Sequence, residues 1–499
     1  MSGIRSRTAT AHGLGAGLLA AILVALTLAA SPAAAQTDDS PTPKKFPLKV
    51  TVQVRLRLEN WDWFDTPLAD GTYEFLASQL RLGIGQDRET WDWQIELAQP
   101  TLLGLPDNAI APAPQGQLGL GASYFAANDF DRNVAGVFPK QAYVRLKGLG
   151  GDKASRLRLG RYEFVDGAET APKDATLAAL KRDRIAHRLI GTFAFSHVGR
   201  SFDGVEYSRS TPASNITVMG GRATQGVFDT HGSIDLDVDV MYGAYTRVVH
   251  KQATGEWRAF VLHYHDGRGA LKVDNRPLPV RRADHENIRV TTVGGHYLDV
   301  FSAGGGKVDV LLWGAWQFGD WGALTHSAGA GAVEAGYQSP WKLKPWFRLG
   351  YFRSSGDGDP ADGDHNTFFQ VLPTPRIYAR FPFFNLMNNE DAFAELILRP
   401  HAKVTLRSDI HWLRLGNSRD LWYLGGGAFQ DTTFGYVGRP SGGRKSLATF
   451  ADVSADWKVS PQVSLSFYLG GAFSRSAIAA SYPDAGNGRF SYLELNWRR

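Results

Sequence analysis

Apolar and polar side chains alternate strictly along residues 48–59. The even positions carry only Leu and Val, and the odd positions carry Lys, Thr, Gln, Arg or Glu. Successive side chains of a β-strand point to opposite faces, so this stretch predicts a strand with one aliphatic and one polar face. About eleven residues is also the length that a tilted transmembrane strand needs. The pattern therefore favours a strand placed between lipid and water.

The same period of two recurs and predicts further strands. Clear examples are residues 79–84, 91–97, 141–146, 234–240, 453–457 and 463–469. A soluble β-sandwich also has one wet face, but its strands are usually shorter.

The connections between these stretches alternate in length. Short turns are predicted at residues 86–90, 147–154, 210–214, 250–255, 302–306, 338–344, 399–402 and 458–461, and the longest links are residues 98–139, 164–199, 354–389 and 416–445. Short turns on one side and long loops on the other are typical of bacterial barrels, where they are periplasmic and extracellular. Eight turns between nine hairpins predict about 18 strands, within about two either way. The predicted fold class is all-β, a transmembrane antiparallel β-barrel over residues 47–499.

The N-terminal region predicts delivery to the cell envelope. Arg5 and Arg7 precede an apolar stretch over residues 14–30, and small residues at 33–35 follow it. This order is typical of a signal peptide, so we expect residues 1–35 to be cleaved before Gln36; an uncleaved anchor is the alternative. Residues 36–46 are polar and Pro-rich and predict a periplasmic lead. The expected location is the bacterial outer membrane.

Composition excludes several other classes. The chain has no Cys, which excludes a thiol nucleophile, an Fe–S cluster and a disulfide framework. The net charge of +5 is small for 499 residues, and basic residues form no run, so we expect no nucleic-acid partner. The sequence carries neither a GxxxxGK[ST] nor a GxSxG motif, so we expect no enzyme and no organic cofactor.

Five stretches of the chain resemble one known family. They are VQVRLRLENWDWF (residues 52–64), LGRYEF (159–164), RLIG…GRSFDGVEY (188–207), SSGDGDPADGDHNTFFQVLPT (354–374) and DIHWLRLGNSRDLWYLGGG (409–427). Together they are similar to the alginate-export family of outer-membrane porins. The resemblance implies an 18-stranded barrel with an Arg-rich, electropositive constriction that passes a polyuronate outward.

Polar positions that alternate with apolar ones are candidates for the lumen. The predicted substrate-binding residues on such positions are Arg55, Arg57, Arg81, Arg145, Arg348, Arg407, Asp409 and His411, and Lys49, Arg156, Arg158 and Arg289 share this pattern. Arginine binds carboxylates with two parallel hydrogen bonds and keeps its charge, and rings of Arg or Lys give pores anion selectivity. The alternative is that these charges pair across strands and only fill the interior.

Two further arginines are candidates for the constriction because their motifs match the family: Arg161 in LGRYEF and Arg200 in GRSFDG. Residues 175–189 have helical propensity inside a long link. We expect this segment either to fold inward and narrow the pore with its basic side chains or to contact lipopolysaccharide phosphates outside.

Two metal hypotheses arise from the sequence. Four aspartates in one extracellular link, Asp357, Asp359, Asp362 and Asp364, present oxygen ligands that could hold Ca²⁺, although Asp/Gly runs also simply form turns. His263 and His265 share one strand face, and a pore-lining role is favoured over a Zn²⁺ site because no third ligand can be assigned.

The sequence therefore predicts a passive outer-membrane channel for an anionic polysaccharide of the alginate type. The alternative is a substrate-selective porin that takes up small organic anions or oligosaccharides. The expected partners are the anionic polysaccharide, outer-membrane lipid and lipopolysaccharide, and a periplasmic secretion scaffold. We expect the barrel to be a monomer.

Overall fold

The computed structural model describes residues 46–250, 252–484 and 486–499. The predicted signal peptide and nearly all of the predicted lead lie outside the described residues. Residues Leu48–Arg499 form one compact unit.

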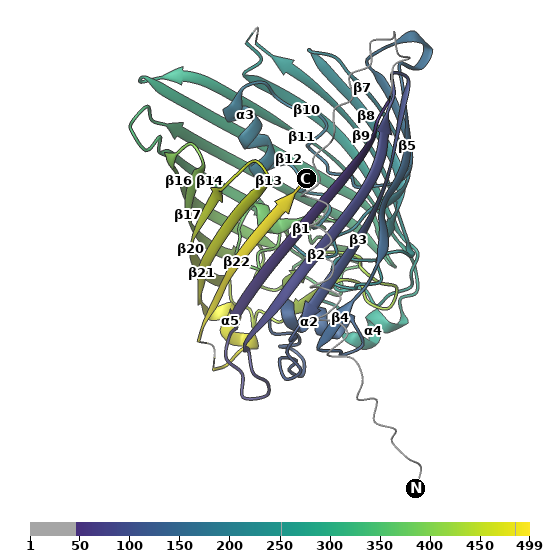
Figure 1. Cartoon of the computed structure of the whole chain (residues 1–499). Coiled ribbons are helices and arrows are strands. Elements are labelled where there is room, and N and C mark those ends of the chain that lie inside the picture. The colour runs from purple at the N-terminus through teal and green to yellow at the C-terminus, as the bar shows by residue number, and fades with distance from the viewer. Residues whose placement is uncertain (1–45, 251, 485) are drawn as a thin grey trace, which may run out of the picture. The chain divides into compact units, whose positions relative to one another are not determined.

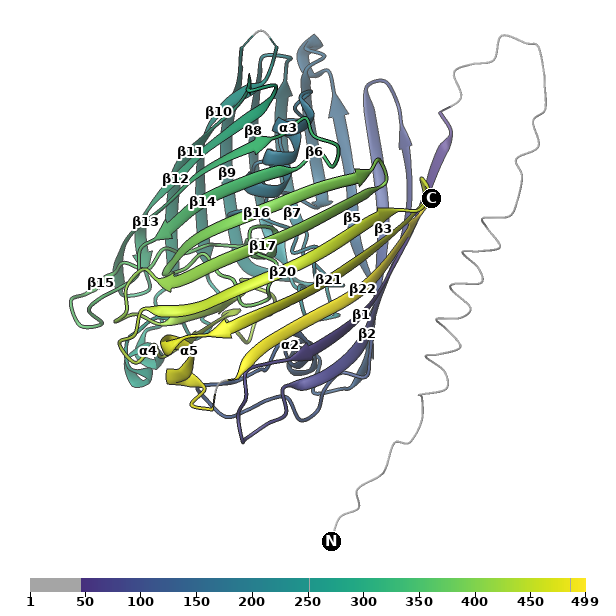
Figure 2. The ribbon, with the colours of Figure 1, turned by 90° about the vertical axis from the view of Figure 1, so that its left-hand side faces the viewer.

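Eighteen strands of the described residues form a closed barrel in which each strand pairs antiparallel with the next, and the first pairs with the last (Figures 1 and 2). In order they are β1 (Leu48–Asp62), β2 (Thr72–Asp87), β3 (Trp91–Leu103), β5 (Phe138–Lys147), β6 (Ser155–Tyr162), β7 (Phe202–Ser210), β8 (Ser214–Thr224), β9 (Asp235–Val249), β10 (Gly255–Asp266), β11 (Ile288–Ala303), β12 (Gly306–Trp321), β13 (Leu324–Gln338), β14 (Trp346–Ser354), β16 (Asn389–His401), β17 (Val404–Leu415), β20 (Ser446–Lys458), β21 (Val463–Ser474) and β22 (Asn487–Arg498). The predicted fold class and strand number are confirmed. Closure leaves the sheet without a free edge, which a membrane requires of a β-structure.

The remaining elements are short and lie in the connections between these strands. The strands are β4 (Asn133–Ala135), β15 (Asp364–His365) and the hairpin of β18 (Trp422–Gly425) with β19 (Tyr436–Arg439); the helices are α2 (Leu120–Ala127), α3 (Ala175–Leu180), α4 (Leu278–Ala283), α5 (Ser476–Ser481), the π-turn η2 (Lys181–Ile185) and the 3-10 turns η1 (Leu149–Gly151) and η3 (Pro375–Ile377). In the described ranges, every helix falls short of the length and apolar character needed to cross a membrane.

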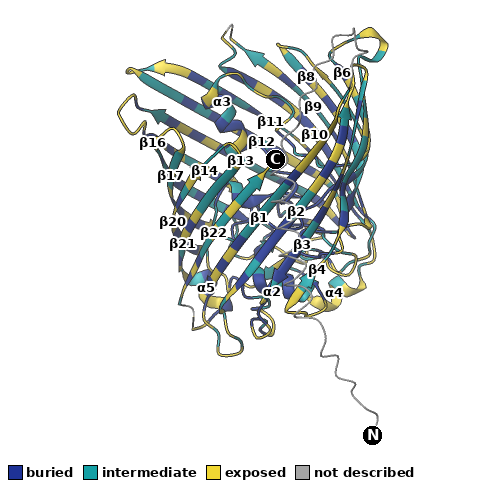
Figure 3. Cartoon of the chain, in the orientation of Figure 1, coloured by how far each residue is buried: buried dark blue, intermediate teal, exposed yellow. Residues whose placement is uncertain are grey.

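The two faces of the wall have the predicted chemistry. On β1, Val50 and Leu58 are 66 % and 47 % exposed on the outer face, whereas Arg57, Glu59 and Trp61 on the inner face are buried. The same alternation of exposed and buried positions runs along the other strands (Figure 3). The exposed apolar side chains therefore face the lipid, and the polar ones face the interior.

Long connections fold into the barrel interior. β6 and β7 have only 8 and 9 residues, against 16 in β11 and β12, so the link between them leaves the wall early. We call this link, residues 163–201, the inward segment. Its Ile190 forms a parallel bridge with Leu372 of the link between β14 and β16. The inward turn of a long link, one of the two expectations for residues 175–189, is thus observed.

Candidate functional site

The inward segment reaches the periplasmic end of the lumen. Asp174 caps α3 by accepting hydrogen bonds from the backbone N–H groups of Thr176 and Leu177 at 2.9 and 3.0 Å. The same carboxylate lies 2.7 Å from Lys307 Nζ, near the start of β12, and Thr176 bonds Gln338, at the end of β13. Both partners border periplasmic turns. Figure 1 accordingly shows α3 at the end of the barrel opposite α2, α4 and α5.

Ion pairs fix the segment against one side of the wall, which we call the docking wall: β10, β13 and β17. Lys181 lies 2.8 Å from Glu256 of β10, and Asp183 lies 3.2 Å from Arg407 of β17. Arg184 donates two parallel hydrogen bonds of 2.8 Å to Glu334 of β13. Such two-point pairs are strong and directional, so they specify where the segment sits.

The returning part of the segment is held by β1. Arg55 donates to the carbonyl oxygens of Ala194, at 2.6 Å, and Ser196, and Arg57 donates to that of Phe195. The Arg57 guanidinium also lies 3.8 Å from the centre of the Phe195 ring. Arg55 and Arg57 thus face inward as predicted, but their guanidinium groups bind the protein's own backbone.

Further predicted residues lie on or near the docking wall in paired arrangements. Arg348 pairs with Glu334 at 3.0 Å and Asp309 at 3.2 Å. Arg407 also pairs with Glu395 at 3.1 Å, and His411 lies 2.9 Å from Asp391.

Asp409 lies in a row of carboxylates. It is the cross-strand partner of Glu395 on β16 and Asp452 on β20, and all three are buried. Three carboxylates therefore meet around Asp409, and this place in the lumen is unsuited to binding an anion.

Buried groups of the inward segment have shifted pKa values. Burial raises the pKa of Asp166 to about 6, although the nearby Arg258 and two backbone N–H groups act in the opposite direction. Burial lowers the pKa of His187 to about 4 and that of His197 well below its usual value. Burial acts to raise the pKa of Asp183, but the charges of Arg407 and Arg182 outweigh it, so the net shift is downward.

The opposite side of the lumen, β5 to β8, holds an open polar cavity of about 340 Å³ between the wall and the start of the inward segment. We call it the arginine cavity. Its charged lining residues are Arg145, Arg156, Arg158, Glu163, Glu169 and Glu206. In Figure 2, β5 and β7 lie behind β16, β17 and β20, across the barrel.

Two arginines of the cavity are direct neighbours. Arg145 of β5 and Arg158 of β6 are cross-strand partners, and like charges in that relation repel. Asp92 lies 2.9 Å from Arg145, and Glu206 pairs closely with Arg158. Arg156, two residues before Arg158 on the same face, is exposed and has no ion pair within the part of the chain that the structure describes. The cavity thus presents one free and two partly neutralised cations.

Arg81 connects this cavity to the segment. Its guanidinium lies 2.5 Å from Glu96 and 2.8 Å from Glu163, the first residue of the inward segment. Two interior cations beyond the predicted ones, Lys140 and Arg258, pair with Glu163 at 3.5 Å and with Glu169 at 2.8 Å. Arg258 lies on the same inner face as the apolar Phe260 and Leu262, so the alternation of apolar and polar residues does not predict that it faces the lumen.

The predicted lumen positions of Arg161 and Arg289 are both wrong, because both residues face outward instead. Arg289 is the cross-strand partner of His265 and lies between the buried Ile288 and Val290. Arg161 stands in the outward row with Ala142 and Asp203, and the outward neighbours Leu159 and Val205 are 44 % and 42 % exposed. Its guanidinium pairs with Asp203 and, at 3.2 Å, with Asp235. Arg156 and Arg158 face inward, so the alternation itself places Arg161 on the other face, away from any constriction.

Arg200 lies in the interior but does not border open space. It is fully buried, and it donates a hydrogen bond to the carbonyl oxygen of Gly426 in the link between β17 and β20. Burial lowers its pKa to about 10. Arg200 therefore joins two inward links.

The structure does not gather the predicted metal ligands. Asp357 and Asp362 accept backbone N–H groups of Asp359 and Asp364, at 3.1 and 3.0 Å, as aspartates in turns do. Across the described residues, no group of three or more His, Asp or Glu is arranged to hold a metal ion. His263 and His265 stand at outward positions beside the exposed Val261, so the predicted pore-lining role is wrong for both.

A closed eighteen-stranded barrel with a lipid-facing apolar exterior and a charged interior defines an outer-membrane porin. The comparisons agree with this class. OpdK of Pseudomonas aeruginosa has a TM-score of 0.52 and 9% identity, over 90% of this chain and 99% of that chain. OccAB4 of Acinetobacter baumannii has a TM-score of 0.53 and 9% identity, over 92% of this chain and 100% of that chain. These likenesses concern the fold alone.

The family model for alginate export matches residues 123–487. The chain belongs to this family, and its location is the bacterial outer membrane. No curated protein matches the sequence.

Proposed function

We propose that the protein is a passive channel for an anionic polysaccharide of the alginate type. The polysaccharide moves past the inward segment, through the arginine cavity. The observation that carries the proposal is the set of three inward guanidinium groups, Arg145, Arg156 and Arg158, beside an open volume of about 340 Å³. Family membership supports the polyuronate as substrate.

The chemistry of the cavity suits a polyuronate. A guanidinium binds a carboxylate with two parallel hydrogen bonds, and each sugar of a polyuronate carries one carboxylate. Conduction requires binding that is favourable enough for entry and weak enough for release. Asp92 and Glu206 already neutralise part of the charge of Arg145 and Arg158, so each site binds a passing carboxylate only moderately.

The position of α3 suggests how export is controlled. Arg182, next to α3, has a side chain that is 68% exposed at the periplasmic end of the lumen. We propose that a periplasmic secretion scaffold contacts this region and displaces the segment when polysaccharide is delivered. The barrel acts as a monomer, and the proposal needs no catalytic step and no cofactor.

A second candidate is uptake of small organic anions or oligosaccharides. The inward links occupy much of the lumen, and a cavity of about 340 Å³ falls within the roughly 300–1,000 Å³ of small-molecule sites. OpdK, 8% identical to this chain, was solved with vanillate. In this case, the segment stays docked during transport and only short anions pass.

The test is a bilayer measurement on the refolded chain from Gln36 onward. The reversal potential is measured under a KCl gradient, and polyuronate is then added from each side, with neutral dextran of equal length as control. The proposal predicts an anion-selective reversal potential and block by polyuronate but not by dextran. Block by uronate dimers alone would favour the second candidate. A cation-selective barrel that ignores polyuronate would contradict both.

A further inference from the structure

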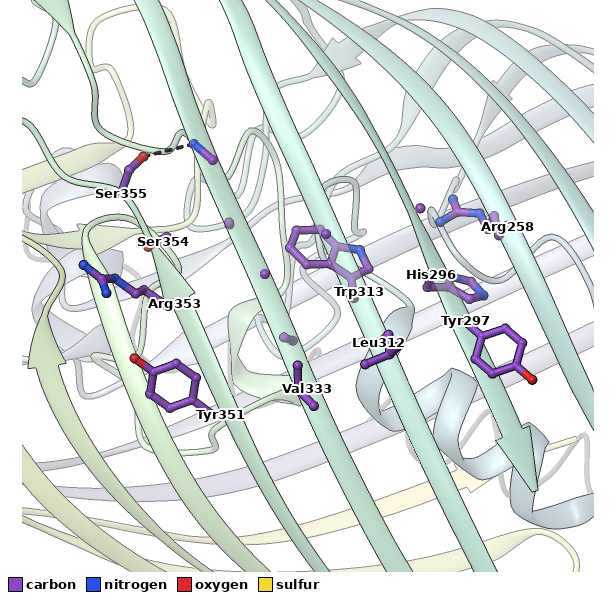
Figure 4. Close-up of a pocket in the computed structure, with 16 residues that line it drawn as sticks. Arg258, His296, Tyr297, Leu312, Trp313, Val333, Tyr351, Arg353, Ser354 and Ser355 are labelled. Carbon is purple, nitrogen blue, oxygen red and sulfur yellow. Dashed lines mark hydrogen bonds between the residues drawn. The ribbon is translucent and has the colours of Figure 1, made fainter. Parts of the chain in front are cut away.

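The lipid-facing surface of the barrel contains a hollow over three adjacent glycines. Gly295 of β11, Gly314 of β12 and Gly331 of β13 are direct cross-strand neighbours. They occupy outward positions, because His296, Trp313 and Ala332 beside them are buried on the inner face. The hollow has a volume of about 900 Å³. Tyr297, Leu312, Val333 and Tyr351 are among the residues that line it (Figure 4).

The backbone does not require two of these glycines. Gly314 and Gly331 avoid the left-handed backbone conformations that favour Gly. A Cβ on Gly331 would meet only the Trp313 carbonyl oxygen, at 3.6 Å, and one on Gly314 only that of Ala330, at 3.8 Å. Glycine weakens a strand, and the backbone at these two positions does not need it. What the two glycines provide is the absence of a side chain, which leaves the space outside the wall empty. Gly295 differs, because its Cβ would collide with the Arg258 carbonyl oxygen.

The glycine row leads directly to a group of cations. The cross-strand partner of Gly331 is Arg353 of β14, and the row continues through Glu390 of β16 to Arg414 of β17. Gly314 lies in the middle of its strand, whereas Arg353 and Arg414 are the last outward residues at the extracellular ends of theirs. The hollow thus runs from mid-membrane towards the extracellular headgroup boundary.

One carboxylate, Glu390, lies among three cations at this boundary and pairs with two of them. Glu390 lies 3.1 Å from Lys445 and 3.6 Å from Arg414. Arg353 is exposed and, among the described residues, takes part in no ion pair. The group therefore has an excess of positive charge on a surface that faces lipid.

The far side of the same rim has the opposite character. There Asp203, Asp235 and Asp239 surround the outward Arg161 and Arg222. The group beside the hollow thus differs in charge from this part of the rim.

We propose that this surface binds one molecule of lipopolysaccharide from the outer leaflet. An acyl chain lies in the hollow over Gly314 and Gly331, and a phosphate of the lipid A headgroup pairs with Arg353, Arg414 and Lys445. Guanidinium groups bind phosphate through paired hydrogen bonds, and burial of the chain between Leu312, Val333 and Tyr351 adds apolar contact. This combination of charge and hollow fits an anionic lipid with several chains.

The test is native mass spectrometry of the whole barrel with added bis-phosphorylated lipid A, with dephosphorylated lipid A and phosphatidylglycerol as comparison lipids. One variant, Gly314→Leu with Gly331→Leu, fills the hollow. A second, Arg353→Gln with Arg414→Gln, removes charge. The matched controls are Gly220→Leu, an outward position with open space on β8, and Arg222→Gln on the acidic side of the rim. Heat-modifiable migration in a gel confirms that each variant is folded.

We expect the unaltered barrel and both controls to retain one bis-phosphorylated lipid A, and both test variants to retain it at least about tenfold less. Dephosphorylated lipid A should bind weakly to every form. Equal retention by all forms would overturn the proposal, as would a preference for phosphatidylglycerol. A dimer that the leucine variant alone disrupts would assign the hollow to a second copy of the chain instead.

Discussion

The two sides of the lumen use the same residue types in different ways. At the docking wall, Arg184 of the inward segment and Glu334 of β13 are 8% and 2% exposed and bind each other across 150 residues of chain. On β5 and β6, Arg145 is 36% exposed and borders open volume. The difference is produced by the inward segment, which covers one wall and leaves the other free. The position of the inward segment therefore decides whether an inward charged side chain binds that segment or contacts a solute in the lumen.

Removal of the inward segment should change the difference between the two walls more than any other alteration. Replacement of residues 168–196 by a short Gly-Ser linker uncovers the docking wall, so both walls then face water. We expect single-channel conductance to rise several-fold, because the segment occupies the lumen from β6 to the periplasmic end. Replacement of the shorter link carrying α4, residues 267–287, by the same linker is the control and should leave conductance unchanged. Unaltered conductance after removal of 168–196 would show that the segment does not limit flow.

The ion pair between Arg184 and Glu334 is the central anchor of the inward segment, and its loss should loosen the segment without removing it. Arg184→Gln leaves Glu334 with a weaker set of partners, and breaking such a buried pair costs about 3 kcal/mol. We expect the free energy of unfolding in urea to fall by about that amount and the current to switch more often to a high-conductance state. Arg182→Gln, at an exposed neighbouring position, is the matched control. Equal behaviour of the two variants would contradict the role of the anchor.

A smaller effect should come from pH, because three buried groups of the segment change their pKa on docking. Burial lowers the pKa of His187 to about 4 and that of His197 well below its usual value, so docking weakens as pH drops below the usual histidine value of about 6.5. The pKa of Asp166 rises to about 6, so its contribution favours docking at low pH and is lost as pH rises through about 6. The two histidines outweigh the single aspartate, and acidification from pH 7 to pH 5 should loosen the segment.

Single substitutions separate these contributions. Asp166→Asn should steepen the loosening at low pH, and His187→Gln should flatten it. The measurement is the fraction of time that one channel spends in the high-conductance state at each pH. Opposite shifts in the two variants support the assignment, whereas equal slopes in all forms would remove it.

The barrel could be predicted because its signals are local. The period of two in β1 and the alternation of short turns with long links depend only on neighbouring residues. The same alternation places Arg156 and Arg158 inward and Arg161 outward, so the strand pattern predicts the face of Arg161 better than the motif around it.

The roles of the interior arginines could not be predicted in the same way. Arg55 binds Ala194, and Arg184 binds Glu334, across 139 and 150 residues of chain. No local pattern reports which long link turns inward or which wall it meets. Asp409 shows the same limit, because its neighbours Glu395 and Asp452 come from two other strands.

The most direct test of the account compares ion selectivity after charge removal on the two walls. Arg156→Gln with Arg158→Gln acts on the free wall and leaves Glu206 without its partner, whereas Arg407→Gln acts on the docking wall. From the reversal potential under a KCl gradient, we expect the first variant to lower the anion-to-cation permeability ratio at least about threefold, with conductance little changed. Arg407→Gln should change the gating and leave the ratio near that of the unaltered barrel. A ratio that falls only when Arg407 is replaced would contradict a permeation path along β5 to β8.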